Sequence, residues 1–211
     1  MERDYFVPFR DYSEDKFEEK RSKFTGRLWH VETAEQATAR IREMRDTYWD
    51  ATHHCYAYIL REGNIMRYSD DGEPQGTAGM PILDVLRHEN LVDVCCVVTR
   101  YFGGVLLGTG GLVRAYTQGA QLAVAAAGVQ RMSLYTVALI ACPYHLYEIV
   151  LHLLPDHDCV VSETDYSADV TLTVTLPAGT ESALNDALAE ATAGTVYAEV
   201  VETRFMGRQV K

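Results

Sequence analysis

The segment Val92–Thr99 constrains the fold most, because it presents apolar side chains to both faces of any strand that it forms. A strand with one face in water alternates apolar and polar residues, whereas residues 94–98 are an unbroken apolar run. We therefore expect a central strand that is covered on both sides, or is at least deeply buried.

This strand lies within residues 69–114, the stretch around which the chain is organised. The same stretch holds an acidic turn, a short helix, and a loop with five glycines that leads into a second helix. Functional chemistry is expected here. Apolar periodicity and turn residues predict strands at 24–30, 54–60, 65–68 and 92–99, and helices at 34–48, from 77 or 78 onward, and at 111–127.

The composition shifts after Gly128, and the remaining chain follows a βαββαβ order. The expected strands are 134–141, 159–165, 169–176 and 196–205, with helices at 144–154 and 180–192. This order is that of the ferredoxin-like sandwich. A length of 211 residues suits two domains, so we predict an α+β protein with domains at 1–130 and 131–211.

The net charge of −11 is unevenly distributed between the two predicted domains. Residues 131–211 carry 4 Lys and Arg against 11 Asp and Glu, whereas residues 1–130 carry 15 against 19. Binding nucleic acid requires a local basic surface. Any such surface must therefore belong to the N-terminal domain, where Lys23 and Arg27 could extend it.

The cysteine pattern and the lack of a long apolar run indicate a cytoplasmic protein without a membrane segment. Five cysteines form no CxxC motif and lie in apolar surroundings, as reduced buried thiols do. No apolar run approaches the roughly 18 to 20 residues that span a bilayer. We predict neither a metal site nor a cofactor, and the oligomeric state is left open.

The glycine loop follows the buried strand and opens a helix, an arrangement that can hold an anion. Glycines leave backbone N–H groups open to a ligand, and a helix N-terminus adds partial positive charge. Arg100 and Arg114 flank the loop. No phosphate-binding fingerprint matches, so a tight crossover packed by small residues is the competing interpretation. The glycines are Gly103, Gly104, Gly108, Gly110 and Gly111.

Two further groups could carry chemistry. The turn Asp70-Asp71-Gly72-Glu73 offers three carboxylates that could bind Mg²⁺ or act as an acid/base pair, although turn chemistry alone favours a solvated turn. His53 and Cys55, two residues apart at a strand start, should share one face. Neighbours at that spacing rarely meet in catalytic geometry, so a structural role is the simpler reading.

Several blocks of this sequence resemble the YigZ/IMPACT family. They are RSKF at 21–24, ATHHCYAY at 51–58, SDDGEPQGTAGMPIL at 69–83 and VVTRYFGGVLLGTGGLVRAY at 97–116. The resemblance implies a left-handed βαβ domain like the fourth domain of elongation factor G, followed by one like its fifth. Eukaryotic members act in translational control by competing for a partner in the starvation-responsive eIF2α kinase pathway, through an extra N-terminal domain that is not found in this sequence.

The resemblance also marks a set of positions as the functional surface without saying what they bind. These positions are His53, Cys55, Asp70, Asp71, Gly72, Glu73, Gly76, Arg100, Tyr101, Gly103, Gly104, Gly108, Gly110, Gly111 and Arg114.

Three functional hypotheses follow from these features. The first is a translation-linked binding protein whose N-terminal domain contacts RNA, a nucleotide or a ribosome-associated partner. The second is an enzyme acting on a phosphorylated or anionic small molecule, which predicts one pocket shared by the acidic turn and the glycine loop. The third is an adaptor whose acidic C-terminal domain binds a basic partner. The sequence leaves open whether the protein is catalytic.

Overall fold

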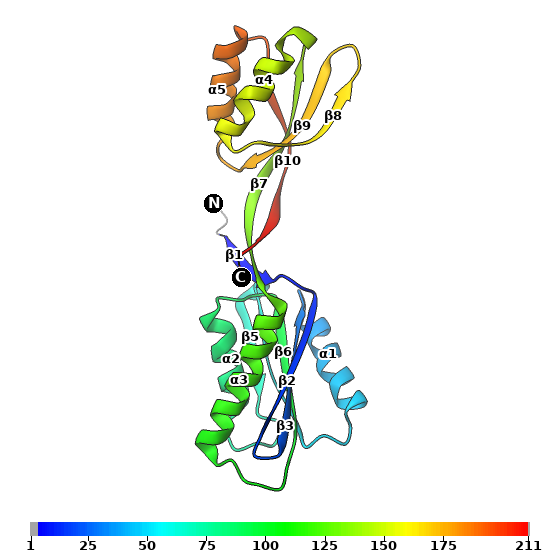
Figure 1. Cartoon of the computed structure of the whole chain (residues 1–211), viewed down its shortest axis with the longest axis vertical. Helices are drawn as coiled ribbons and strands as arrows, with labels where there is room; N and C mark the ends of the chain where they lie inside the picture. The colour runs from blue at the N-terminus through cyan, green and yellow to red at the C-terminus, as the bar shows by residue number, and fades with distance from the viewer. Residues whose placement is uncertain (1–3, 211) are drawn as a thin grey trace. The chain divides into compact units, whose positions relative to one another are not determined.

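A computed structural model describes residues 4–210, which form two compact units (Figure 1). One unit comprises residues 5–131 and 208–210, and the other comprises Asp4 and residues 132–207. Each unit combines a β-sheet with helices. The predicted two-domain α+β class is confirmed.

The larger unit is built on a five-stranded sheet in the order β2-β3-β6-β4-β5, in which all neighbours are antiparallel. The strands are β2 (Tyr12–Glu19), β3 (Ser22–His30), β6 (Val94–Tyr101), β4 (His53–Leu60) and β5 (Ile65–Ser69). Strand β6 lies in the middle, and all of its residues except Tyr101 are buried. The sequence prediction of a central, covered strand is confirmed.

Helices cover both faces of this sheet (Figure 1). Helix α1 (Ala34–Thr47) packs with Cys95 and Val97 on one face. Helices α2 (Gly79–His88) and α3 (Thr109–Ala127) pack with Cys96 and Val98 on the other. Alternate residues of β6 therefore enter two different cores, which explains its unbroken apolar run. Among residues 4–210 no helix has both the length and the apolar character needed to cross a membrane.

The residues that cap helix α1 and the small residues of helix α3 both have structural roles. Thr33 and Gln36 form a reciprocal capping box at the start of α1. Gly119 of α3 lies against Gly26 of β3, where a Cβ on Gly26 would be 2.0 Å from the Gly119 carbonyl oxygen. Two glycines thus allow the helix to approach the sheet closely.

Two strands at the N-terminus, β1 (Tyr5–Pro8) and β2, were not predicted. Strand β2 is an edge strand, and most of its side chains are charged and exposed. Only Ser13 and Phe17 face inward, and the Ser13 hydroxyl donates a hydrogen bond of 2.7 Å to the Ala123 carbonyl of α3. With two inward-facing side chains, β2 shows little of the apolar–polar alternation by which a strand is predicted from sequence.

The smaller unit follows the predicted βαββαβ order. Its elements are β7 (Val129–Cys142), α4 (Tyr147–Leu153), β8 (Val160–Tyr166), β9 (Val170–Pro177), α5 (Glu181–Thr192) and β10 (Ala198–Gln209). Strand β7 pairs with both β9 and β10, and β8 lies beyond β9, as in a ferredoxin-like sheet. The handedness of the crossovers and the likeness to elongation factor G remain predictions.

We predict that Gly26→Ala destabilises the larger unit by about 3 kcal/mol, because the new Cβ meets backbone atoms that cannot rotate away. Urea unfolding followed by tryptophan fluorescence measures the change. Gly110→Ala is the matched control, since a Cβ there would meet only the Arg114 guanidinium at 3.8 Å. Equal stability of the two variants would contradict the close helix–sheet contact.

Candidate functional site

One end of the five-stranded sheet gathers most of the residues singled out from the sequence. His53 begins β4 and lies directly opposite Arg100, near the end of β6. The acidic turn follows β5, which pairs with β4, and the glycine loop follows β6. Antiparallel pairing thus brings together the start of one strand and the ends of two others.

A cavity of about 410 Å³ lies between the acidic turn and the glycine loop. Its lining residues are Thr52, His53, Glu73, Pro74, Arg100, Phe102, Leu106, Leu107, Gly108, Thr109 and Leu112. The cavity therefore has largely apolar walls with a few charged and polar groups, a combination that is typical of ligand sites.

Glu73 and Arg100 form a buried ion pair at this cavity. Arg100 Nη1 donates to Glu73 Oε1 at 2.6 Å, and the Tyr116 hydroxyl donates to the same oxygen at 2.7 Å. Both charged side chains are more than nine-tenths buried. Burial raises the pKa of Tyr116, so its hydroxyl remains a donor. The two charges largely cancel, which leaves this part of the cavity nearly neutral.

Arg100 is held on several sides yet keeps one unpaired donor. Its guanidinium carbon lies 5.5 Å from the centre of the Phe24 ring and 5.4 Å from that of Phe102. Nη2 donates to the Ser22 hydroxyl at 3.3 Å. The buried Nε has no hydrogen-bond partner among the described residues. A buried donor without a partner is costly, which makes this atom notable at a cavity wall.

His53 presents one ring nitrogen toward Glu73. Its Nδ1 lies 2.8 Å from the Asp71 carbonyl oxygen, which can only accept, so the hydrogen is on Nδ1. Nε2 lies 3.8 Å from Glu73 Oε2. A neutral His53 therefore offers an acceptor nitrogen next to a carboxylate oxygen, an arrangement that can hold or move a proton.

Cys55 lies on the same face as His53 but is buried beneath the turn. Its thiol donates to the Asp70 carbonyl at 2.9 Å, and burial raises the pKa of the thiol. A buried thiol with a raised pKa is a poor nucleophile. On the opposite face, burial lowers the pKa of His54, whose ring lies 3.1 Å from the Tyr48 carbonyl oxygen and which has a structural role.

The two aspartates of the acidic turn are fixed by the protein itself. Asp70 accepts hydrogen bonds of 2.8 to 3.0 Å from the backbone N–H groups of Gly76, Ala78 and Gly79. Asp71 accepts from the His54 backbone N–H at 2.7 Å and from Arg45 at 2.6 Å. These contacts order the turn and the start of α2, which weighs against either aspartate as a metal ligand or acid/base group. Within residues 4–210 no cluster of His, Cys, Asp and Glu is arranged to hold a metal ion.

The glycine loop brings the start of α3 to the cavity. Gly103 packs against the β2–β3 turn, where a Cβ would lie 2.0 Å from the Arg21 carbonyl carbon. Gly108, the residue before the helix, has φ 75°. The first turn of α3 has N–H groups without intrahelical partners, and Arg114 Nη1 lies near Gly110. Backbone donors, helix dipole and a guanidinium thus occur together.

The remaining residues shape the surroundings. Tyr101 donates to Asp50 at 2.8 Å, and Gly72 and Gly76 adopt positive φ in the acidic turn. Arg27 does not extend a basic surface, because it is buried and paired with Glu14 at 2.6 Å. Tyr116 was missed from the sequence, although it lies on α3 two turns beyond the glycine loop.

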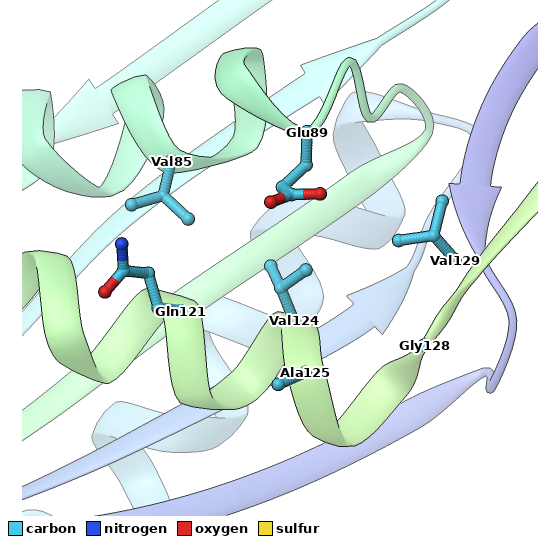
Figure 2. A pocket seen from close by; sticks show the side chains of 7 residues that line it. All are labelled: Val85, Glu89, Gln121, Val124, Ala125, Gly128 and Val129. Atoms are coloured by element: carbon cyan, nitrogen blue, oxygen red, sulfur yellow. The ribbon is translucent and has the colours of Figure 1, made fainter. Parts of the chain in front are cut away.

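A second cavity of about 300 Å³ lies at the other end of helices α2 and α3 (Figure 2). Val85, Val124 and Val129 form apolar walls, and the side chains of Glu89 and Gln121 supply polar groups. None of the positions predicted from the sequence lines it.

Comparisons with known proteins match both halves of the chain. Residues 20–124 match the model of the Impact N-terminal domain, and residues 140–195 match a domain of unknown function, DUF1949. The chain is 37% identical over 186 residues to IMPACT family member YigZ of Escherichia coli K12, covering 87% of this chain and 91% of that protein. It is 33% identical over 192 residues to IMPACT family member YvyE of Bacillus subtilis, covering 90% and 88%.

A solved structure supports the same similarity. The crystal structure of an hypothetical protein aligns with a TM-score of 0.60 and 34% identity, over 96% of this chain and 99% of that one. The similarity thus extends over both units.

We predict that Arg100→Met destabilises the protein by about 3 to 5 kcal/mol, because it leaves Glu73 charged, buried and without its cation. Adding Glu73→Leu should restore much of the loss, since no buried charge then remains. Thermal and urea unfolding measure both variants.

Arg40→Ala provides the control, because Arg40 pairs with Glu43 on an exposed helix surface. Its effect should stay within about 0.5 kcal/mol. If Arg100→Met lowered the free energy of unfolding as little as Arg40→Ala, Arg100 could not be the cation that neutralises a buried Glu73.

Proposed function

The chain belongs to the IMPACT family, and on that basis we propose that it is a translation-linked binding protein whose N-terminal unit captures a phosphate-bearing ligand, RNA or nucleotide. The ligand's phosphate would lie at the start of α3. The observation that carries this proposal is the cavity of about 410 Å³ whose wall includes Gly108 and Thr109 at that helix start.

The charges around the cavity favour an anion at α3. Glu73 is neutralised by Arg100, so it does not repel an anion strongly. The unpaired N–H groups of the first turn and Arg114 then supply the net positive potential. The buried Nε of Arg100 has no hydrogen-bond partner among the described residues, so the cavity wall also contains a donor whose hydrogen bond the protein itself does not supply.

Arg114 is better suited to contact the ligand than Arg100. Arg114 is exposed, whereas Arg100 is 5% exposed and committed to Glu73 and Ser22. Arg100 would act by holding Glu73 and the cavity wall in place. We propose this division of roles for the two arginines that flank the glycine loop.

The link to translation and the cytoplasmic location belong to the proposal as well. The translational role is what the family resemblance implies, with an RNA or a ribosome-associated protein as partner. All five cysteines are free and buried, which supports a reducing compartment such as the cytoplasm.

An enzyme acting on an anionic small molecule is the second candidate, favoured by the placement of His53. Its Nε2 lies 3.8 Å from Glu73 Oε2, and both residues line the cavity that also contains the start of α3. A proton acceptor beside an anion site is the minimum that phosphoester or acyl chemistry requires. The fixed positions of Asp70 and Asp71 leave Glu73 as the only carboxylate of the turn available for that chemistry.

For the binding role, we predict that Arg114→Ala weakens binding of single-stranded RNA or a nucleoside triphosphate roughly tenfold, because it removes one charged contact to phosphate. The slope of log affinity against log salt should fall by about one. Fluorescence anisotropy over a salt series measures both quantities.

Arg42→Ala is the matched control, since Arg42 is exposed on α1, on the opposite face of the sheet. It should leave affinity and salt slope unchanged. Equal effects of Arg42→Ala and Arg114→Ala, or no binding of either ligand by the unmodified protein, would reject the proposed function.

For the enzymatic role, we predict that His53→Gln lowers turnover of a responsive phosphate ester by about 100-fold or more, because the acceptor nitrogen is lost. His145→Gln, an exposed change in the other unit, should have no effect. A panel of phosphate esters assayed by phosphate release provides the measurement. Absence of turnover across the panel, or full activity of His53→Gln, would exclude this candidate.

A further inference from the structure

The sheet end that contains the cavity also exposes four large apolar side chains. Trp49 is 82% exposed, Leu106 is 81% exposed and Phe102 is 45% exposed, and Val105 is also exposed. Contiguous exposed apolar groups on a protein surface often mark a binding region. The two aromatic residues among them offer flat faces to a ligand.

Backbone contacts place these residues on adjoining segments. The Thr52 N–H donates to the Arg100 carbonyl at 2.9 Å, and the Phe102 N–H donates to the Thr52 hydroxyl at 3.0 Å. The Ala51 N–H donates to the Tyr48 carbonyl at 2.9 Å, which makes residues 48–51 a tight turn. Trp49 occupies the middle of that turn, so its ring projects into solvent.

Basic side chains surround the same end. Lys20 and Arg21 form the exposed turn between β2 and β3, and the Arg21 backbone packs against Gly103 of the loop. Lys23 lies opposite Tyr101 in the β3–β6 register. With Arg114 these give four exposed cations. Exposed carboxylates lie among them, because Glu18 is opposite Lys23 in the β2–β3 register and Glu19 precedes Lys20, whereas Asp71 is paired with Arg45.

Exposed aromatic rings beside cations suit one class of macromolecule in particular. A single-stranded nucleic acid presents unstacked bases, which stack on aromatic rings, and phosphates, which pair with Lys and Arg. A duplex keeps its bases stacked on one another and would leave Trp49 unused. A purely apolar protein segment would form no ion pair with any of the four cations.

We propose that this sheet end is a docking surface for single-stranded RNA, with one base stacked on Trp49 and a nearby base on Phe102. The inference rests on the proposed function, because the RNA phosphates would reach Arg114 and the start of α3. It adds the ligand class, unpaired RNA, and the residues that contact its bases.

The two tryptophans make the proposal directly measurable. Trp29 is buried in the α1 core, so Trp49 provides the solvent-sensitive emission. An unlabelled uridine oligomer of about ten nucleotides, which offers several bases per site, should quench Trp49 fluorescence on binding. The same sequence in a duplex should not, and neither should inorganic phosphate.

Substitutions at Trp49 separate stacking from simple apolar contact. Trp49→Leu keeps an apolar group but removes the ring, and should weaken binding of the oligomer about tenfold. Trp49→Phe keeps a ring and should retain affinity within about threefold. Tyr197→Leu is the control, because Tyr197 is an exposed aromatic residue in the other unit. Circular dichroism verifies that each variant is folded.

The outcomes distinguish this inference from the proposed function. Stacking is rejected and the phosphate site stands if Arg114→Ala weakens oligomer binding, Trp49→Leu leaves the affinity unchanged, and the oligomer does not quench Trp49 fluorescence. If duplex and single strand bind and quench equally, the single-strand assignment is wrong. If Trp49→Leu binds as well as the unmodified protein, the apolar surface serves another partner, such as a protein. If no RNA binds but a nucleoside triphosphate does, this inference fails and the phosphate site stands. If neither binds, both proposals fail.

Discussion

The buried ion pair between Glu73 and Arg100 is the interaction on which the candidate site depends. It connects the acidic turn after β5 to the last part of β6, and Tyr116 ties the same carboxylate to α3. Three segments distant in the sequence are thereby fixed around one cavity. The pair is buried, so its value lies less in net stability than in the position that it imposes.

This placement sets the charges that line the cavity. Neutralising Glu73 internally leaves the start of α3 and Arg114 as the source of positive potential, while His53 keeps an acceptor nitrogen beside the carboxylate. Asp70 and Asp71, which seemed equally reactive in the sequence, have their oxygens occupied by backbone N–H groups and Arg45. One turn thus combines two structural carboxylates with one that faces the cavity.

Much of the fold could be predicted because it rests on local patterns. The burial of β6 was predicted from its apolar run, and the βαββαβ order of the smaller unit from its apolar periodicity. Strand β2 was not, because an edge strand with a charged outer face carries little periodicity. The sequence predicts which residues form the candidate site, which stays a prediction, but it cannot show that Arg27 and Arg100 are buried, since burial depends on long-range packing.

Backbone amide chemical shifts provide the most direct test of the central claim that a phosphate-bearing ligand binds at the start of α3. Titration of the ¹⁵N-labelled protein with a nucleotide should shift the N–H resonances of Thr109, Gly110 and Gly111 most strongly, because these groups face the ligand in our account. Shifts concentrated elsewhere, or none at ligand concentrations in the millimolar range, would contradict it.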